Sequence, residues 1–225
     1  MQRPLLSIML LCATMMIFGA QGAPELTAEE LAFLQAHPEV RIGVDPEFIP
    51  FEFIDSEGIY QGIAADILQL IEQRIDLKFV LQGPLSWQEV TARIQRGDLD
   101  VLPAVGMTPE RQSFLSFTRP YITFQRSAVV KQTNQSITSF EDLFGKQVAV
   151  QASSSHHGML NQYPSIILRI YDTVEEALLA VHRGDEIVFV GNEATITYSA
   201  GANSISGLKL IPIDTNEVLQ LHMAV

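Results

Sequence analysis

Apolar and polar positions alternate along the chain with two different periods. Between Ile63 and Ile75, apolar residues recur at helical spacing and form one stripe, which predicts an amphipathic helix. The runs 51–54 and 59–61 flank a turn-forming segment and predict a hairpin. Alternation of strands and helices is typical of an α/β protein with a largely parallel sheet. Further strand-like runs lie at 40–44, 77–81, 101–104, 147–150, 166–171 and 187–190.

Capping residues mark where several helices begin. Ser86 to Glu89 and Thr173 to Glu176 have the form of capping boxes, in which a hydroxyl and a carboxylate three residues apart satisfy free backbone amides. Thr108 followed by Pro109 predicts the start of a short helix, since proline fits the first helical position. Ser139 is expected to cap another short helix, which ends by Gly145.

Two segments nearly repeat, at 95–103 and 182–190. Each predicts a helix end, a glycine stop and a buried strand, so the chain is expected to hold two similar half-domains in sequence. The extended run 122–130 lies between them, and the apolar run 219–225 returns afterwards. Two such connectors would form a hinge between two lobes.

The first 22 residues have the order of a secretory signal peptide. Arg3 is followed by an apolar run from Leu5 to Phe18 and then by small residues, with cleavage expected after Gly22. This run is short for a membrane span, which takes about 20 apolar residues, although an uncleaved anchor is the alternative. We therefore expect export to the periplasm, with residues 23–38 forming a lead-in helix to the fold.

Composition narrows the possible functions. Cys12, the only cysteine, lies in the expected signal peptide, so the mature chain should have neither a disulfide nor a thiol nucleophile. The formal net charge of −12 at pH 7 argues against binding nucleic acid or an anionic membrane. An anion-binding pocket would have to be built locally, against this overall field.

Candidate site residues follow from the rule that ligands bind beyond the carboxyl ends of strands in open α/β sheets. Arg111 is the strongest candidate, because a guanidinium in the first turn of a helix can hold a carboxylate through two hydrogen bonds. The alternative is a surface ion pair with Glu110. The rule nominates the segments 45–51, 104–111, 151–156 and 191–193, with Asp45 and Ala104 at strand ends.

Three further groups could contact a solute. Ser154 and Ser155 lie at a strand-to-helix turn, where hydroxyls and amides can bind a polar group or merely cap the helix. Phe48 and Phe51 could form an apolar wall, with core packing favoured for Phe51. Asn192 follows a buried strand and offers hydrogen bonds to a ligand or to a helix cap.

Signals for metals, cofactors and catalysis are weak. His156 and His157 are adjacent, so they point in different directions on a helix, and no acid completes a metal-binding set. The sequence has no nucleophile elbow, no His-Glu-x-x-His and no glycine-rich phosphate loop. We predict no metal site, no cofactor and no enzyme activity.

From about Val40 to Val225 the chain resembles the family 3 solute-binding proteins, the periplasmic clamps of polar amino-acid transporters and of sensor-kinase flytrap domains. The resemblance implies a two-lobed, type II periplasmic-binding-protein-like α/β clamp with two crossover strands. It implies lobe 1 at 39–126, lobe 2 at 127–216 and a return crossover at 217–225. The markers, specific only in this order, are Arg41-Ile-Gly-Val-Asp45, Pro50-Phe-Glu-Phe53, Gly62-Ile-Ala-Ala-Asp66, Trp87 before Gly97-Asp-Leu-Asp-Val101, Thr108-Pro-Glu-Arg111, Phe117-Thr-Arg-Pro-Tyr121 and Ser139-Phe-Glu-Asp-Leu-Phe-Gly-Lys146.

The resemblance also assigns roles to residues. The carboxylate-clamping arginine falls on Arg111, the paired hydroxyls on Ser154 and Ser155, and the aromatic wall on Phe48. Amino-acid binders hold the substrate ammonium with an aspartate where this chain has Asn192, a departure that weighs against an α-amino-acid ligand. Family members usually continue beyond the second crossover, so we expect the C-terminal part of lobe 1 to be truncated.

The expected function is periplasmic binding of a small carboxylate-bearing solute, an amino acid or an organic acid, for transport or signalling. Expected partners are the small-molecule ligand and either the permease of an ABC transporter or the membrane-bound remainder of a sensor, with no nucleic acid. The alternatives are a dehydratase-like enzyme on the same scaffold and an accessory sensor domain of a larger receptor.

Overall fold

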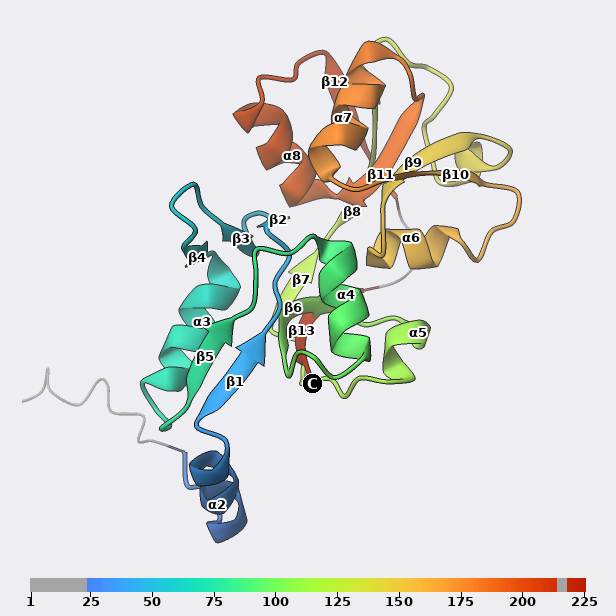
Figure 1. The fold of residues 1–225 in the computed structure, drawn as a ribbon. Helices are drawn as coiled ribbons and strands as arrows, with labels where there is room; N and C mark the ends of the chain where they lie inside the picture. Colours follow the sequence, from blue (N-terminus) through green and yellow to red (C-terminus); the bar gives the residue numbers. More distant parts are fainter. Residues whose placement is uncertain (1–23, 214–217) are drawn as a thin grey trace, which may run out of the picture.

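The computed structural model describes residues 24–213 and 218–225, which fold into two lobes connected by extended strands (Figure 1). The two-lobed α/β fold predicted from the sequence is therefore confirmed. The expected signal peptide at 1–22 lies outside the described residues. None of the helices within 24–213 and 218–225 combines the length and apolar character needed to cross a bilayer.

Lobe 1 contains three small sheets. Strand β1 pairs in parallel with β5, and Ile42 extends this layer through a parallel bridge to Val101. Strands β2, β3 and β4 form the predicted hairpin and its neighbour, and β13 pairs antiparallel between β6 and β7. The elements are β1 (Glu39–Ile42), β2 (Glu47–Phe48), β3 (Glu52–Ile54), β4 (Tyr60–Gln61), α3 (Ile63–Glu72), β5 (Lys78–Leu81), α4 (Trp87–Gln95), β6 (Leu102–Gly106), α5 (Pro109–Gln112), β7 (Ile122–Phe124) and β13 (Leu219–Ala224).

Lobe 2 is built on one sheet of five strands in the order β10-β9-β11-β8-β12. Strands β10, β9 and β11 run parallel, whereas β8 lies antiparallel to both β11 and β12, so the sheet is mixed. The elements are β8 (Arg126–Lys131), the 3₁₀ helix η2 (Glu141–Leu143), β9 (Gln147–Gln151), α6 (Ser155–Leu160), β10 (Ile167–Tyr171), α7 (Val174–Arg183), β11 (Val188–Asn192), α8 (Glu193–Ala202) and β12 (Leu208–Pro212).

Two chain crossings connect the lobes. The predicted extended run 122–130 is two strands, β7 in lobe 1 and β8 in lobe 2, separated by Gln125. The chain later returns from β12 to β13, whose partners are both lobe 1 strands. The lobes are consequently joined through β-strands at both crossings (Figure 1).

Local sequence signals explain most helix starts. Ser86 and Glu89 form the predicted capping box of α4. The Thr173 side chain accepts from the Glu176 amide at the start of α7, although the reciprocal half of the predicted box is not among the described contacts. Helix α7 ends at Gly184, whose φ of 93° favours glycine.

Two details of the sequence prediction are wrong. Ser139 does not cap a helix; instead, the Asp142 carboxylate reaches back and accepts from the amides of Thr138 and Ser139. Helix α3 ends at Glu72 rather than near Ile75; in the turn that follows, the amides of Arg74 and Ile75 both donate to the Ile71 carbonyl.

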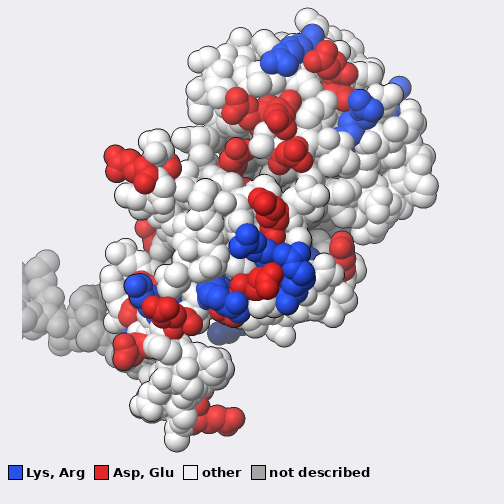
Figure 2. Space-filling view, viewed as in Figure 1, with Lys and Arg blue, Asp and Glu red and all other residues white. Residues whose placement is uncertain are grey.

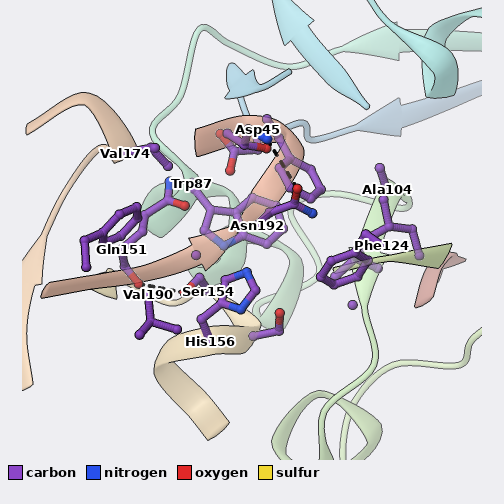
Figure 3. Close-up of a pocket in the computed structure, with 18 of the residues that line it drawn as sticks. Asp45, Trp87, Ala104, Phe124, Gln151, Ser154, His156, Val174, Val190 and Asn192 are labelled. Carbon is purple, nitrogen blue, oxygen red and sulfur yellow. Dashed lines mark hydrogen bonds between the residues drawn. The ribbon is translucent and has the colours of Figure 1, made fainter. Parts of the chain in front are cut away.

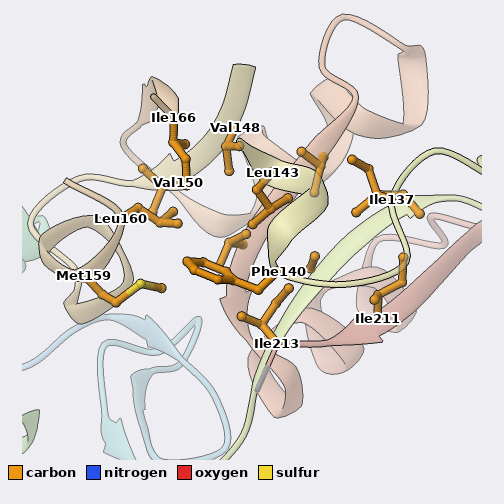
Figure 4. Packing of buried hydrophobic residues seen from close by; sticks show 14 residues of the cluster. Ile137, Phe140, Leu143, Val148, Val150, Met159, Leu160, Ile166, Ile211 and Ile213 are labelled. Carbon is orange, nitrogen blue, oxygen red and sulfur yellow. The ribbon is translucent and has the colours of Figure 1, made fainter. Parts of the chain in front are cut away.

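Apolar residues on alternate positions of lobe 2 strands pack two layers of helices. One face of the sheet, with Val129, Ala149 and Phe189, packs against α7 and α8. The other face packs against α6 and η2 through a cluster of 14 buried residues (Figure 4). This double covering makes lobe 2 the better-buried half of the molecule, and it holds the carboxyl ends of β9 and β11 towards lobe 1.

The N-terminal helix α2 (Ala28–Ala36) differs from the others. Thr27 and Glu30 form a capping box, yet the helix has no buried residue and projects away from lobe 1 (Figure 1). Its stability rests on local contacts and not on a core.

Replacing Leu178 in α7 by alanine should lower the free energy of unfolding by about 2–5 kcal/mol, since the side chain is 0% exposed and its loss leaves a cavity. The matched control is Leu70→Ala in α3, where leucine is 53% exposed and the change should have little effect. Urea denaturation of both variants measures the difference, and equal stability losses would contradict the packing described here.

Candidate functional site

The carboxyl ends of strands from both lobes enclose a cavity in the gap between them. Its volume is about 40 Å³, measured as the space open to the centres of water molecules, which is room for more than one water. Seven of the eight predicted site residues line it: Asp45, Phe48, Ala104, Arg111, Ser154, Ser155 and Asn192. Figure 3 shows Asp45, Ala104, Ser154 and Asn192 around this cavity.

Arg111 lies in helix α5 and reaches across the gap. Thr108 caps this helix by accepting from the Arg111 amide, which fixes the backbone from which the side chain extends. Nη1 donates to the Gly106 carbonyl at 2.7 Å within lobe 1, and Nη2 donates to the Ser153 carbonyl of lobe 2 at 2.6 Å. The guanidinium carbon stands 5.4 Å from the centre of the Trp87 ring, in cation–π range.

Burial dominates the electrostatics of Arg111. The residue is 7% exposed, so the alternative of a surface ion pair with Glu110 does not describe it. Burial lowers the pKa of the guanidinium to about 10, while the charges of Glu110 and Asp45 act in the opposite direction. Arg111 therefore stays charged at neutral pH and places a positive charge inside a strongly acidic protein.

Ser153 to Ser155 form the lobe 2 wall opposite Arg111. Ser153 adopts a left-handed φ of 56°, and its carbonyl accepts from the Trp87 indole at 3.1 Å as well as from Arg111. Ser154 caps α6, accepting from the His157 amide and donating to the Gln151 carbonyl. Both hydrogen-bonding directions of the Ser154 hydroxyl are thus already in use.

Ser155 lies against lobe 1 at Gly106. A Cβ added to Gly106 would stand 3.3 Å from both the Cβ and the Oγ of Ser155, tighter than most real contacts. The two lobes approach this closely only because position 106 has no side chain.

Asp45 belongs to a buried carboxyl pair in lobe 1. Its amide donates to Glu52 Oε1 at 2.9 Å, its own Oδ1 accepts from the Glu47 amide at 3.0 Å, and Gln151 of lobe 2 also hydrogen-bonds to it. Burial raises the pKa of Asp45 to about 6, and burial likewise raises the pKa of Glu52 well above its ordinary value. Tyr60 completes the network by donating to Glu52 Oε2 at 3.1 Å.

His156 contributes a neutral imidazole to the cavity wall. Arg126 Nε donates to His156 Nδ1 at 3.0 Å, and burial, followed by the charges of Arg126 and Arg111, lowers the pKa of the ring well below its usual range. Within 24–213 and 218–225, no three His, Cys, Asp or Glu residues are grouped closely enough to hold a metal ion.

Aromatic residues enclose the apolar side of the cavity. Phe48 is at the wall, whereas Phe51, the remaining predicted site residue, packs behind it with a ring-centre separation of 4.8 Å. Phe51 contacts the core cluster that includes Ala104 and does not line the cavity, as the core-packing alternative expected. Phe124 stands edge-on to His156, with ring centres 6.1 Å apart.

Asn192 ends β11 and caps α8. Its Oδ1 accepts from the amides of Ala194 at 2.9 Å and Thr195 at 3.3 Å. Asn192 therefore caps a helix, one of the two roles expected from the sequence, and its side chain also lines the cavity. Among the described buried side chains, Asn192 Nδ2 and Thr195 Oγ1 have no hydrogen-bond partner.

Several lining residues were not predicted individually. Gln151 and His156 fall in a nominated strand-end segment, so their location was anticipated but not their roles. Val105, Gly106 and Gly191 likewise lie in the nominated segments 104–111 and 191–193. The remaining residues lie in the first turn of a helix, in a crossing strand or inside a strand, where local sequence gives no sign of a cavity. They are Trp87, Phe124, Val174, Phe189, Val190, Thr195 and Leu221.

Acidic side chains from both lobes lie near the gap. Figure 2 shows carboxylates on both lobes at the level of the gap. Partial burial raises the pKa of Glu47, with further contributions from Asp45 and from Glu175 and Glu176 of the opposite lobe. These carboxylates raise the negative charge at one part of the gap, whereas Arg111 supplies a buried positive charge inside it.

Comparisons with known proteins agree with this architecture. The model of the bacterial extracellular solute-binding proteins, family 3, matches residues 40–212. The virulence sensor protein BvgS of Bordetella pertussis is 30% identical over 176 residues, which cover 78% of this chain but only 14% of that protein. A putative amino-acid ABC transporter-binding protein, PatH of Vibrio harveyi, is 29% identical over 161 residues, or 70% of this chain and 64% of that one.

Solved structures show the same fold. The periplasmic VFT2 domain of Bordetella pertussis BvgS has a TM-score of 0.77 at 27% identity, covering 90% of this chain and 86% of that domain. An ancestral arginine-binding protein bound to glutamine has a TM-score of 0.73 at 27% identity, covering 84% of each chain.

The Asp45→Asn substitution should make the protein more stable at neutral pH than the wild type. The folded-state pKa of about 6 exceeds the ordinary 3.8, so the folded protein binds the extra proton. Asp45 therefore contributes its full stabilisation below its ordinary pKa of 3.8. As the pH rises through the folded-state pKa of about 6, the free energy of unfolding falls by on the order of 3 kcal/mol. The free energy of unfolding of Asp45→Asn should therefore rise relative to that of the wild type as the pH increases over this range. Urea denaturation at a series of pH values measures the difference.

Asp55→Asn provides the control of opposite sign. The amide of Ile59 is the main cause that lowers the pKa of Asp55, so the wild type should lose stability relative to this variant as the pH falls. A pH-independent difference between Asp45→Asn and the wild type would contradict the burial assigned to Asp45.

Proposed function

Because the chain belongs to the bacterial extracellular solute-binding proteins, family 3, we propose that the cavity between its lobes binds a small solute through a carboxylate held by Arg111. The observation that carries this proposal is a guanidinium, charged at neutral pH, that is 7% exposed and lines the interlobe cavity. Burying such a charge costs free energy that a bound anion would recover.

Arg111 retains donors for a ligand. A guanidinium has five N–H groups, and two of them donate to the Gly106 and Ser153 carbonyls. Trp87 covers one face of the guanidinium and orients its plane. The Ser155 hydroxyl, which faces the same cavity, could add one more hydrogen bond to a carboxylate.

Binding rather than catalysis is the function that these groups support. The imidazole of His156 accepts from Arg126 through Nδ1. Asp45 Oδ1 accepts from the Glu47 amide, and its carboxyl also bonds Gln151. These titratable groups are engaged with protein partners, and family members are binding proteins. The rival is a dehydratase-like enzyme, and product formation from cyclic unsaturated acids incubated with the protein would favour it.

Closure of the lobes would communicate binding to a partner. A ligand shifts an open-to-closed equilibrium only by binding the closed form more tightly. The PatH relative is described as a putative ABC transporter-binding protein and the BvgS relative as a sensor. We accordingly propose a periplasmic clamp whose partner is a transporter permease or the membrane-bound part of a sensor.

Arg111→Ala should reduce affinity for carboxylate ligands by at least about tenfold, since a hydrogen bond to a charged group contributes about 1.5–3 kcal/mol. Calorimetry with a panel of amino acids and organic acids provides the measurement. Arg111→Lys should restore the affinity only in part, because an ammonium lacks the bidentate geometry.

Arg119→Ala is the matched control, because this arginine is exposed and does not line the cavity. It should bind like the wild type. Equal binding by Arg111→Ala and the wild type would overturn the assignment of the carboxylate site.

A further inference from the structure

Two polar atoms at one side of the cavity lack any partner. They are Nδ2 of Asn192 and Oγ1 of Thr195, in residues that are 4% and 2% exposed. A buried polar group left without a hydrogen bond costs about 1–3 kcal/mol, so such groups are rare in folded proteins and call for an explanation. Both residues line the same cavity as Arg111.

The orientation of the Asn192 amide is fixed by the helix that it caps. Oδ1 accepts from the amides of Ala194 and Thr195, so a flipped side chain would turn its own NH₂ group against two N–H donors. Nδ2 must therefore point away from the helix start. The Asn192 side chain lines the cavity, as do Trp87 and Phe124 (Figure 3), and its unpaired Nδ2 donor lies on the side away from the α8 amides.

Thr195 adds a second group in the first turn of α8. Its hydroxyl can donate one hydrogen bond and accept others. The first turn of a helix carries a partial positive charge, which favours an oxygen acceptor over a cation at this place. The amide donor, the hydroxyl and the helix start all select for the same kind of ligand atom.

We propose that Asn192 and Thr195 bind a second oxygen-bearing group of the ligand, a hydroxyl, carbonyl or carboxylate, so that the ligand places an oxygen at this position, as a hydroxy, keto or dicarboxylic acid can, and not the ammonium of an α-amino acid. This inference rests on the proposed binding of the first carboxylate by Arg111. An ammonium group has three donors and no acceptor, so it cannot satisfy Asn192 Nδ2.

The carboxyl group of Asp45 already has partners from both lobes. Asp45 Oδ1 already accepts from the Glu47 amide, and Gln151 of lobe 2 also bonds to the carboxyl. Burial further disfavours its charged form. An α-amino acid that placed its ammonium at Asn192 would therefore leave the Nδ2 donor unpaired.

Pairs of ligands that differ only in hydroxyl and ammonium groups test the inference by calorimetry. Lactate and alanine, malate and aspartate, and phenyllactate and phenylalanine are such pairs. In at least one pair the wild type should bind the hydroxy acid at least about tenfold more tightly than the amino acid, because the mismatched ligand leaves buried polar groups unpaired.

Asn192→Asp is the decisive variant. Aspartate caps helices as well as asparagine does, so α8 keeps its start, but the second side-chain oxygen now presents an acceptor to the cavity. The preference between the two members of a pair should shift by at least about tenfold towards the amino acid. Thr195→Val should weaken hydroxy-acid binding, whereas Thr197→Val, which loses only a bond to the Glu193 carbonyl on the exposed side of α8, should not.

The outcomes separate the two proposals. Tighter binding of amino acids by the wild type, or an unchanged preference in Asn192→Asp, overturns the role of Asn192 and Thr195. If binding still depends on Arg111 in that case, the proposed function stands without this inference. Failure of the wild type to bind any member of either series counts against the carboxylate site itself, and the inference falls with it.

Discussion

The arrangement of the two lobes depends on how the charge of Arg111 is accommodated inside the protein. A guanidinium out of water is costly unless its hydrogens have partners, and the partners come from both lobes: the Gly106 carbonyl on one side and the Ser153 carbonyl on the other. The Trp87 ring covers the guanidinium and donates to that same Ser153 carbonyl. The absence of a side chain at Gly106 lets Ser155 approach closely enough to complete this contact.

The cavity is assembled from residues that also begin helices. Thr108 caps α5 and positions Arg111, Ser154 caps α6 across the gap, and Asn192 caps α8. Each cap follows a strand, so the strand-to-helix turns bring polar side chains and free amides to the edge where the two lobes meet. The side chains that stabilise these helix starts therefore lie where a ligand would bind. Each of them can offer a ligand only the hydrogen bonds that the cap does not use.

Sequence patterns could predict those parts of the site that depend on local order. Arg111 and Asn192 were recognisable because each follows a strand-like run near a helix start, and the hairpin and the α4 capping box were equally local. The roles of Phe124 and Thr195 could not be predicted, because they depend on how a crossing strand and one helix face are placed against the other lobe. The prediction that Ser139 caps a helix was wrong because serine is a common cap before a short helix, whereas here the Asp142 carboxylate accepts from the Ser139 amide.

Trp87 is the one tryptophan in the sequence, and its indole N–H donates across the gap to Ser153. Separation of the lobes would break that bond and admit water to a ring that the closed form keeps dry. Since indole emission depends on the polarity around the ring, any separation of the lobes would change the fluorescence of this one tryptophan. Its spectrum can be followed in real time without any attached dye, on the natural chain.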